Sequence, residues 1–154
     1  MDAQLLMKTA ALAGELMLCS GAETYRVEDT MHHILKTADN LEMAEVLVIM
    51  TGITATIKQK DENVISIVKR VNSRSTNMSC IMEVNDISRR YCGEEITLEE
   101  AYKELSGLKK NIYSRLENRL GVLGICVGFA IFFGGGIREI LVTLLVGLVL
   151  TGCM

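Results

Sequence analysis

The stretch LGVLGICVGFAIFFGGGI, residues Leu120–Ile137, contains no charged side chain. A helix of about 18 residues spans about 27 Å, close to the roughly 30 Å hydrocarbon core of a bilayer. A buried core helix of a soluble protein has a similar composition, but residues 1–119 are too few to enclose it together with the apolar residues that follow. The stretch therefore predicts a transmembrane helix and, with it, a membrane protein.

A second uncharged stretch, ILVTLLVGLVLTGCM, follows Arg138 and Glu139 and continues to residue 154. About 15 helical residues reach only about 22 Å, which is short of a complete crossing. We therefore expect a transmembrane hairpin whose second span is truncated, in a fragment of a longer multi-span protein. The alternative is a short hairpin that enters the bilayer and returns.

The charged residues divide the chain into two parts. All of them except Arg138 and Glu139 precede Leu120, and the net charge of the whole chain is −3. This division predicts an α+β cytosolic domain over residues 1–112, followed by the first hairpin of α-helical transmembrane segments over residues 113–154. No basic stripe with interleaved aromatic residues occurs, so nucleic-acid binding is not expected.

Three features predict that the leading domain lies in the cytoplasm. The N-terminus lacks the basic region and the uninterrupted apolar run of a signal peptide. The five cysteines are scattered without a C-x-x-C pair, as expected for free thiols in a reducing compartment. Basic residues also gather just before the first predicted span, which favours the cytoplasmic side for that flank. They are Lys109, Lys110, Arg115 and Arg119.

Periodicity predicts the secondary structure of the leading domain. Apolar residues at helical spacing indicate four helices: residues 3–19, a helix from about Ala22 to Ala38, a helix between the polar loop 72–77 and Gly93, and a helix that begins with a capping box at Thr97. Between the second and third helices, residues 46–50, 53–58 and 64–71 read as strands joined by short turns. The predicted layout is αα-βββ-αα with an antiparallel meander.

Few side chains of this domain form a chemical motif. His32 and His33 are adjacent, so on a helix they point about 100° apart and do not make a two-ligand metal site. One ring is expected at the edge of the core and the other in water. Ser20 lacks the strand and the G-x-S-x-G turn of a nucleophile, so its expected role is to cap a helix. We predict no catalytic residue, no metal and no cofactor.

The residues before the third helix allow two interpretations. Arg74–Asn77 combine a cation with three hydrogen-bonding side chains. Either they bind an anion with the free amides and the positive dipole end of the helix, or they form a plain N-cap with a solvated Arg74.

Glycines recur in the predicted spans. A G-x-x-x-G pattern favours close packing of helices in lipid, although glycine-rich spans also produce it by chance. The GGG run is either broken-helix backbone of the kind that lines a transport path or a flexible loop. The predicted packing positions are Gly124, Gly128, Gly134, Gly135 and Gly147.

Five motifs together resemble a known family. They are SGAETYRVEDTM (20–31), TGI (51–53), RSTN (74–77), EVNDISRRY (83–91) and FGGG (133–136). In these motifs, and over nearly its whole length, the chain resembles the threonine/serine exporter family. It resembles in particular the family's N-terminal-domain subunit, which is similar to the larger half of a bacterial two-component succinate exporter. Relatives usually carry Pro before the Thr-Gly turn and ahead of the first span. This chain has no Pro, so the geometry of both places stays open.

The resemblance implies a subunit of a secondary transporter, not an enzyme. Such a protein is multi-pass in the cell (plasma) membrane, has a cytoplasmic N-terminal domain, and exports threonine and serine or a dicarboxylate such as succinate. The expected partners are the lipid bilayer, a small-molecule substrate, a second small membrane subunit and a further copy of the chain. The alternative is a membrane-tethered cytosolic domain with a regulatory or enzymatic role.

The resemblance also implies one functional surface made by the matching polar residues. Arg26 and Arg74, both near helix starts, would hold the carboxylate of a substrate. In the competing interpretation, Glu23 pairs with Arg74 and only fixes the loops. The candidate residues are Ser20, Gly21, Glu23, Thr24, Tyr25, Arg26, Thr51, Gly52, Arg74, Ser75, Thr76, Asn77 and Asn85.

Overall fold

The computed structural model describes residues 2–38, 40–60, 63–108 and 115–152. The chain divides into two compact units, Met1–Lys110 and Asn111–Met154. The first unit contains α1 (Ala3–Cys19), α2 (Thr24–Leu35), β1 (Leu41–Ile49), β2 (Gly52–Gln59), β3 (Ile65–Arg70), α3 (Met78–Cys92) and α4 (Leu98–Gly107). This order confirms the predicted α+β layout αα-βββ-αα.

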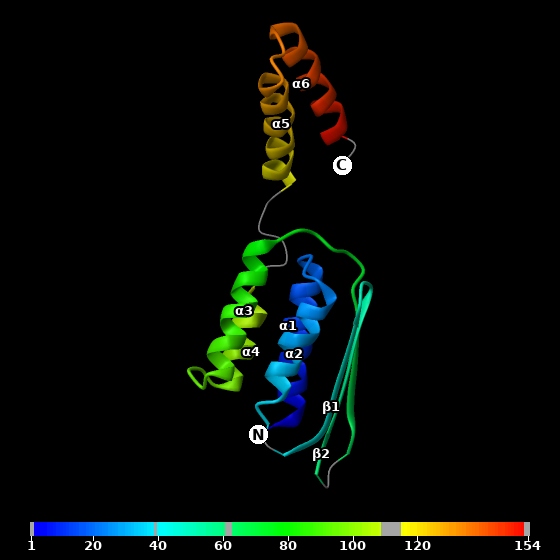
Figure 1. Ribbon diagram of the computed structural model, residues 1–154, viewed down its shortest axis with the longest axis vertical. Coiled ribbons are helices and arrows are strands. Elements are labelled where there is room, and N and C mark those ends of the chain that lie inside the picture. Colours follow the sequence, from blue (N-terminus) through cyan, green and yellow to red (C-terminus); the bar gives the residue numbers. More distant parts are fainter. Residues whose placement is uncertain (1, 39, 61–62, 109–114, 153–154) are drawn as a thin grey trace. The chain divides into compact units, whose positions relative to one another are not determined.

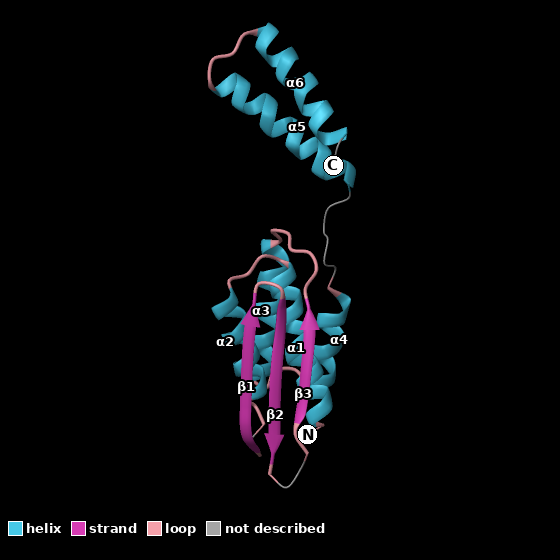
Figure 2. Ribbon diagram, turned by 90° about the vertical axis from the view of Figure 1, so that its right-hand side faces the viewer, coloured by secondary structure: helices cyan, strands magenta, loops and turns pink. Residues whose placement is uncertain are grey.

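The three strands form an antiparallel meander in the order β1-β2-β3 (Figure 2). One face of the sheet is buried, because Ile53, Ala55 and Ile57 alternate along β2 with more exposed residues. The opposite face carries exposed apolar side chains such as Leu47 and Val68. β1 is longer than predicted, since it begins at Leu41 and accommodates two glutamates that obscured the strand pattern.

Helix α1 is the centre of the unit. It packs against α2, α3, α4 and the sheet, so that the unit has three layers: the sheet, α1 with α2, and α3 with α4 (Figure 1). Small residues let its neighbours approach closely. Gly14 is one of them, because a Cβ there would collide with the side chain of Met31. Most of the surface of α1 is buried, and only Gln4 and Lys8 are exposed, which explains why the helix is apolar nearly throughout.

The ends of α1 and α4 follow from local sequence. α1 ends in a Schellman motif, in which the N–H of Gly21 bonds the carbonyl of Leu18 and the N–H of Ala22 bonds that of Met17. Gly21 has the positive φ of 88° that this motif requires. α4 begins with the predicted capping box, formed by Thr97 and Glu100.

The second unit contains α5 (Arg115–Phe132) and α6 (Ile137–Gly152), which pack against each other. The prediction of transmembrane segments is wrong. Of the residues that the structure describes, none belongs to a helix that is both long enough and apolar enough to cross a bilayer.

Two structural facts explain this error. The uncharged stretch is not one helix, because α5 ends at Phe132 and leaves only Leu120–Phe132, about 20 Å, as its uncharged part. α6 has 16 residues and carries Arg138 and Glu139 in its first turn. Counting apolar residues across the glycine run therefore overestimated the length of the first helix.

The glycine run is a compact turn between α5 and α6. Gly134 has a φ of 76°, and the N–H groups of Gly134 and Gly135 bond the carbonyls of Ile131 and Ala130, which is a second Schellman motif. Gly147 meets α5, since a Cβ there would lie 2.9 Å from Leu123 Cδ2. Gly124 and Gly128 have no such neighbour within 4 Å in the described part of the chain.

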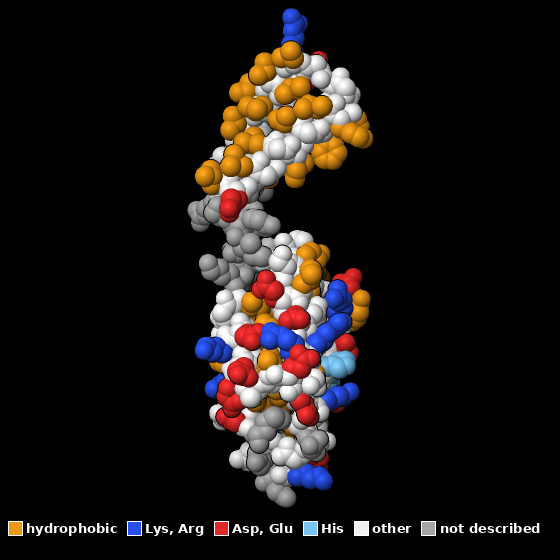
Figure 3. Space-filling model, turned by 90° about the vertical axis from the view of Figure 1, so that its left-hand side faces the viewer, with side chains coloured by type: hydrophobic (Ala, Val, Ile, Leu, Met, Phe, Trp, Pro, Cys, Tyr) orange, Lys and Arg blue, Asp and Glu red, His pale blue; other side chains and the backbone are white. Residues whose placement is uncertain are grey.

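The two units have different surfaces. Hydrophobic side chains cover much of the α5–α6 hairpin, and they include Phe129, Phe132 and Leu145, which are all exposed (Figure 3). The α3–α4 face of the α+β unit instead carries interspersed acidic and basic side chains.

Candidate functional site

Most of the candidate residues lie at one end of the α+β unit. There α1 ends, α2 and α3 begin, and the β1–β2 turn lies beside them (Figures 1 and 2). We call this region the motif end and define it as residues Ser20–Arg26, Thr51–Gly52 and Arg74–Asn77. Asn85 is outside it, because it lies eight residues after Asn77 in α3, about 12 Å along the helix.

Backbone hydrogen bonds join the segments of the motif end. The N–H of Ser75 bonds the carbonyl of Cys19 at 2.8 Å, and the N–H of Asn77 bonds that of Ser20 at 3.0 Å. A Cβ on Gly21 would lie 3.1 Å from the Ser75 carbonyl oxygen, so the two loops are in close contact. The loops that carry the S-G-A-E-T-Y-R and R-S-T-N motifs are thus bonded directly to each other.

The T-G motif is held at the same end by the third strand. The N–H of Val71 bonds the Thr51 carbonyl at 2.9 Å, and Gly52 pairs with Arg70. A Cβ on Gly52 would lie 2.9 Å from the carbonyl oxygen of Lys69. Glycine is needed here because the two backbones approach so closely.

Arg74 links the two loops through its side chain. Its Nε donates to the Leu18 carbonyl at 3.0 Å, and its Nη2 donates to the Ala22 carbonyl at 2.9 Å. Within the described residues, no ion pair joins it to Glu23. Arg74 is thus exposed but bonded to two backbone carbonyls, a role that neither sequence interpretation included. It places a cation at the C-terminal end of α1, where the helix dipole is negative.

The start of α2 presents the more accessible groups. Glu23 is the N-cap residue but makes no capping hydrogen bond with its side chain. Tyr25 is 65% exposed, and hydrogen bonding to Glu23 raises the pKa of its hydroxyl. The exposed guanidinium of Arg26 has no hydrogen-bond or ion-pair partner among the described residues. Arg26 can therefore receive a ligand without breaking a contact within the described residues, whereas Glu23 and Tyr25 already bond each other.

Two other candidate residues stand at helix ends as cap residues. Ser20 is the C-cap residue of α1 and is buried, and its Oγ lacks a protein hydrogen-bond partner in the described part of the chain. Asn77 caps α3, because its side chain accepts a hydrogen bond from the Cys80 N–H at 3.1 Å. The N-cap interpretation therefore describes Asn77 correctly.

The adjacent histidines have the surroundings that the sequence predicted. His33 is exposed and its Nδ1 lies 2.8 Å from the Asp29 carbonyl oxygen, whereas His32 is half-buried. The described residues contain no group of three or more His, Cys, Asp or Glu side chains that could hold a metal ion.

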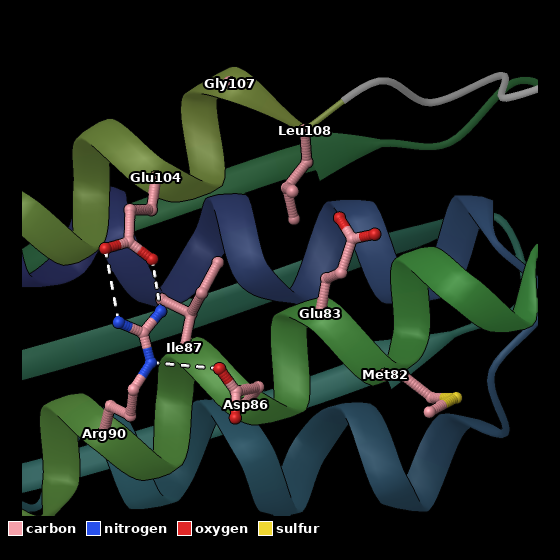
Figure 4. Close-up of a pocket in the computed structure, with 8 residues that line it drawn as sticks. All are labelled: Met82, Glu83, Asp86, Ile87, Arg90, Glu104, Gly107 and Leu108. Carbon is pink, nitrogen blue, oxygen red and sulfur yellow. Dashed lines mark hydrogen bonds and ion pairs between the residues drawn. The ribbon is translucent and has the colours of Figure 1, made fainter.

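Sequence reasoning missed a groove between α3 and α4. It has a volume of about 640 Å³ and is lined by residues from both helices (Figure 4). Arg90 reaches across it, donating from Nε to Asp86 at 3.0 Å and binding the carboxylate of Glu104 with both terminal nitrogens. Because Asp86 lies in α3 and Glu104 lies in α4, Arg90 links the two helices through its ion pair with Glu104.

Sequence reasoning also missed a pocket at the end of the unit that lies opposite the motif end, where α2 and α3 end and α4 begins. We call it the α2–α3–α4 pocket. It has a volume of about 480 Å³, and its lining comes from the C-terminal ends of α2 and α3, the following loop and the start of α4. The residues that line it are Lys36, Thr37, Tyr91, Cys92, Glu94, Glu95, Ile96, Thr97 and Glu100. Burial raises the pKa of Tyr91 and of Cys92, so both side chains are protonated at neutral pH.

Comparison with known proteins gives the chain a family. A family model described as "Putative threonine/serine exporter" matches residues 8–154. A similar curated protein is the "Probable threonine/serine exporter" of Mycobacterium tuberculosis (strain ATCC 25618 / H37Rv), which is 24% identical over 123 residues. The match covers 79% of this chain but only 23% of that protein's length. No solved structure matches the chain. Because the family model covers nearly the whole sequence, the chain belongs to the threonine/serine exporter family.

Proposed function

We propose that this chain is part of a secondary transporter that exports small polar metabolites, and that its α+β unit lies on the cytoplasmic side of the membrane. Threonine and serine are the first substrates to test, since the family and the mycobacterial relative are both described as exporters of these amino acids. A dicarboxylate such as succinate is the second. A second small membrane subunit and a further copy of the chain are the proposed partners.

The observation that carries this proposal is the assembly of the motif end. Three motifs that are far apart in the sequence meet there. Hydrogen bonds from Arg74, Ser75 and Asn77 join two of them, and the Val71 N–H holds the third through the Thr51 carbonyl. The fold thereby gathers exposed polar side chains at one place.

Arg26 is the best candidate for contact with substrate. It lies in the first turn of α2, where the free amides and the helix dipole favour an anionic group. A carboxylate is common to amino acids and dicarboxylates, and an arginine binds it with two charge-assisted hydrogen bonds. Arg74 acts differently, because two of its donors already bond backbone carbonyls.

Isotope efflux tests the proposal. Cells that lack the protein are complemented with the parent or with Arg26→Ala, loaded with labelled threonine, serine or succinate, and followed over time. We expect the parent to restore efflux and Arg26→Ala to lower it by about tenfold, the loss expected for one charge-assisted contact. Arg89→Ala, which removes an exposed arginine near the far end of α3, is the matched control and should export like the parent. Equal efflux with and without the protein would contradict the transport function.

A further inference from the structure

The α2–α3–α4 pocket contains opposite charges that do not neutralise each other. Lys36 lies at the end of α2, whereas Glu94 and Glu95 follow α3. All three side chains are exposed, and in the described part of the chain no ion pair connects the lysine to either glutamate. A ligand that carries both charges would satisfy both sides of the pocket at once.

The remaining polar groups are already committed. Thr37 Oγ1 donates to the Ile34 carbonyl at 2.8 Å, so in its 2.8 Å contact with the Tyr91 hydroxyl it must be the acceptor. Glu100 is held by the capping box, where its Oε2 accepts from the Thr97 N–H at 2.8 Å. Among the described residues that line the pocket, the charged side chains without a protein partner are therefore Lys36, Glu94 and Glu95.

Glu94 also has an unusual backbone conformation. Its φ is 60°, and no other non-glycine residue in the described part of the chain has a positive φ. It occupies the left-handed position of the Schellman motif that ends α3, since the Glu94 N–H bonds the Tyr91 carbonyl and the Glu95 N–H bonds that of Arg90. Glycine is usual at that position, so a glutamate there costs stability and places a carboxylate at the pocket.

From this lining we propose that the α2–α3–α4 pocket binds a small zwitterion, namely an α-amino acid with a short side chain. The ligand carboxylate pairs with Lys36, and its ammonium group pairs with Glu94. The half-buried Ile96 and Cys92 form an apolar wall against the short side chain. A pocket of this volume lies within the roughly 300–1,000 Å³ range of small-molecule sites.

The charges select this class over its alternatives. A dicarboxylate would meet one lysine but three carboxylates, and a simple cation would leave the lysine unpaired.

The α2–α3–α4 pocket is also distinct from the motif end. α2 has 12 residues and α3 has 15, so the two regions lie about 18–22 Å apart along these helices. The pocket therefore acts as a sensor of the exported class of metabolite. Only this role and the choice of probes rest on the proposed function.

Isothermal titration of the purified full chain tests the binding. The probes are L-threonine and L-serine, together with L-threonine amide, which lacks the carboxylate, and N-acetyl-L-threonine, which lacks the ammonium charge. We expect at least one amino acid to bind and both modified probes to bind about tenfold more weakly or not at all. No binding of either amino acid at about 10 mM, or preferential binding of succinate, would overturn the proposal.

Variants locate the site. Lys36→Met and Glu94→Gln should each weaken binding by about tenfold, whereas the matched controls Lys8→Met and Glu83→Gln, which replace exposed side chains outside the pocket lining, should bind like the parent. Glu94→Gly should bind as weakly as Glu94→Gln while raising the melting temperature by about 4 °C, because it relieves the left-handed strain. Unchanged binding in Lys36→Met or in both Glu94 variants would place the ligand elsewhere. Since no transport is measured, failure here leaves the efflux test of the exporter function intact.

Discussion

Removal of the Arg74 side chain tests whether this residue holds the motif end together. In the folded chain its guanidinium donates to the carbonyls of Leu18 and Ala22 at 3.0 and 2.9 Å. Arg74→Ala removes both bonds and the favourable charge at the C-terminal end of α1. The variant should therefore lower the free energy of unfolding of the α+β unit.

The expected loss follows from the surroundings of the two carbonyls. A hydrogen bond to a charged group contributes about 1.5–3 kcal/mol when it is well shielded. Arg74 is exposed, and the Leu18 carbonyl keeps its bond from the Gly21 N–H, so water and backbone compensate in part. We expect a total loss of about 2 kcal/mol, which corresponds to about 8 °C in melting temperature for a unit of this size.

Near-UV circular dichroism measures this unit, because the buried Tyr91 belongs to it. Thermal and urea unfolding should show the loss for Arg74→Ala and most of it for Arg74→Lys, since an ammonium group does not reproduce the guanidinium geometry. Arg26→Ala is the control and should stay within about 0.5 kcal/mol of the parent. A similarly small effect of Arg74→Ala would refute the structural role.

Three further predictions concern other parts of the chain. The backbone hydrogen bond from Thr97 lowers the pKa of Glu100 below its ordinary 4.5, so this carboxylate stabilises the fold above that pH and ceases to do so as the pH falls through its folded value. Glu100→Gln should accordingly be less stable than the parent at pH 7 in urea unfolding, and the difference should shrink near pH 3. Gly134→Ala should destabilise the α5–α6 hairpin by about 1–2 kcal/mol because φ is positive there, whereas Gly124→Ala should not; equal hydrogen-exchange protection of the hairpin in both would contradict this. Residues 1–112 should fold alone and unfold cooperatively, and a molten, aggregating fragment would show that its core is completed elsewhere.

The α+β layout could be predicted because each local signal agreed with the final packing. Gly21 and Thr97 marked a helix end and a helix start, and the alternation around Ile53, Ala55 and Ile57 marked the buried face of β2. Tertiary contacts did not override these signals. The membrane-crossing length could not be read in this way, because composition does not reveal that Gly134 ends the helix.

The candidate site was predictable only in part. The motifs singled out residues that meet at one end of the α+β unit. They did not reveal that Arg74 bonds the end of α1, since such a contact depends on the loop geometry. The α2–α3–α4 pocket could not be predicted from the sequence either, because it also depends on loop geometry. In C-G-E-E the general preference of glycine predicts a left-handed Gly93, yet Gly93 is the C-cap residue and Glu94 has the positive φ.

The two proposed binding regions share the same helices. α2 and α3 begin at the motif end and end at the α2–α3–α4 pocket, and α1 packs against both of them. A ligand in the pocket binds only the folded ends of α2 and α3, so its binding free energy adds to the stability of the helices that position Arg26 and the loop before Asn77. An amino acid that occupies the pocket would thereby favour an ordered motif end. This physical link requires no contact between the two regions, and it would connect the strained Glu94 with the surface that we propose for export, about 20 Å away.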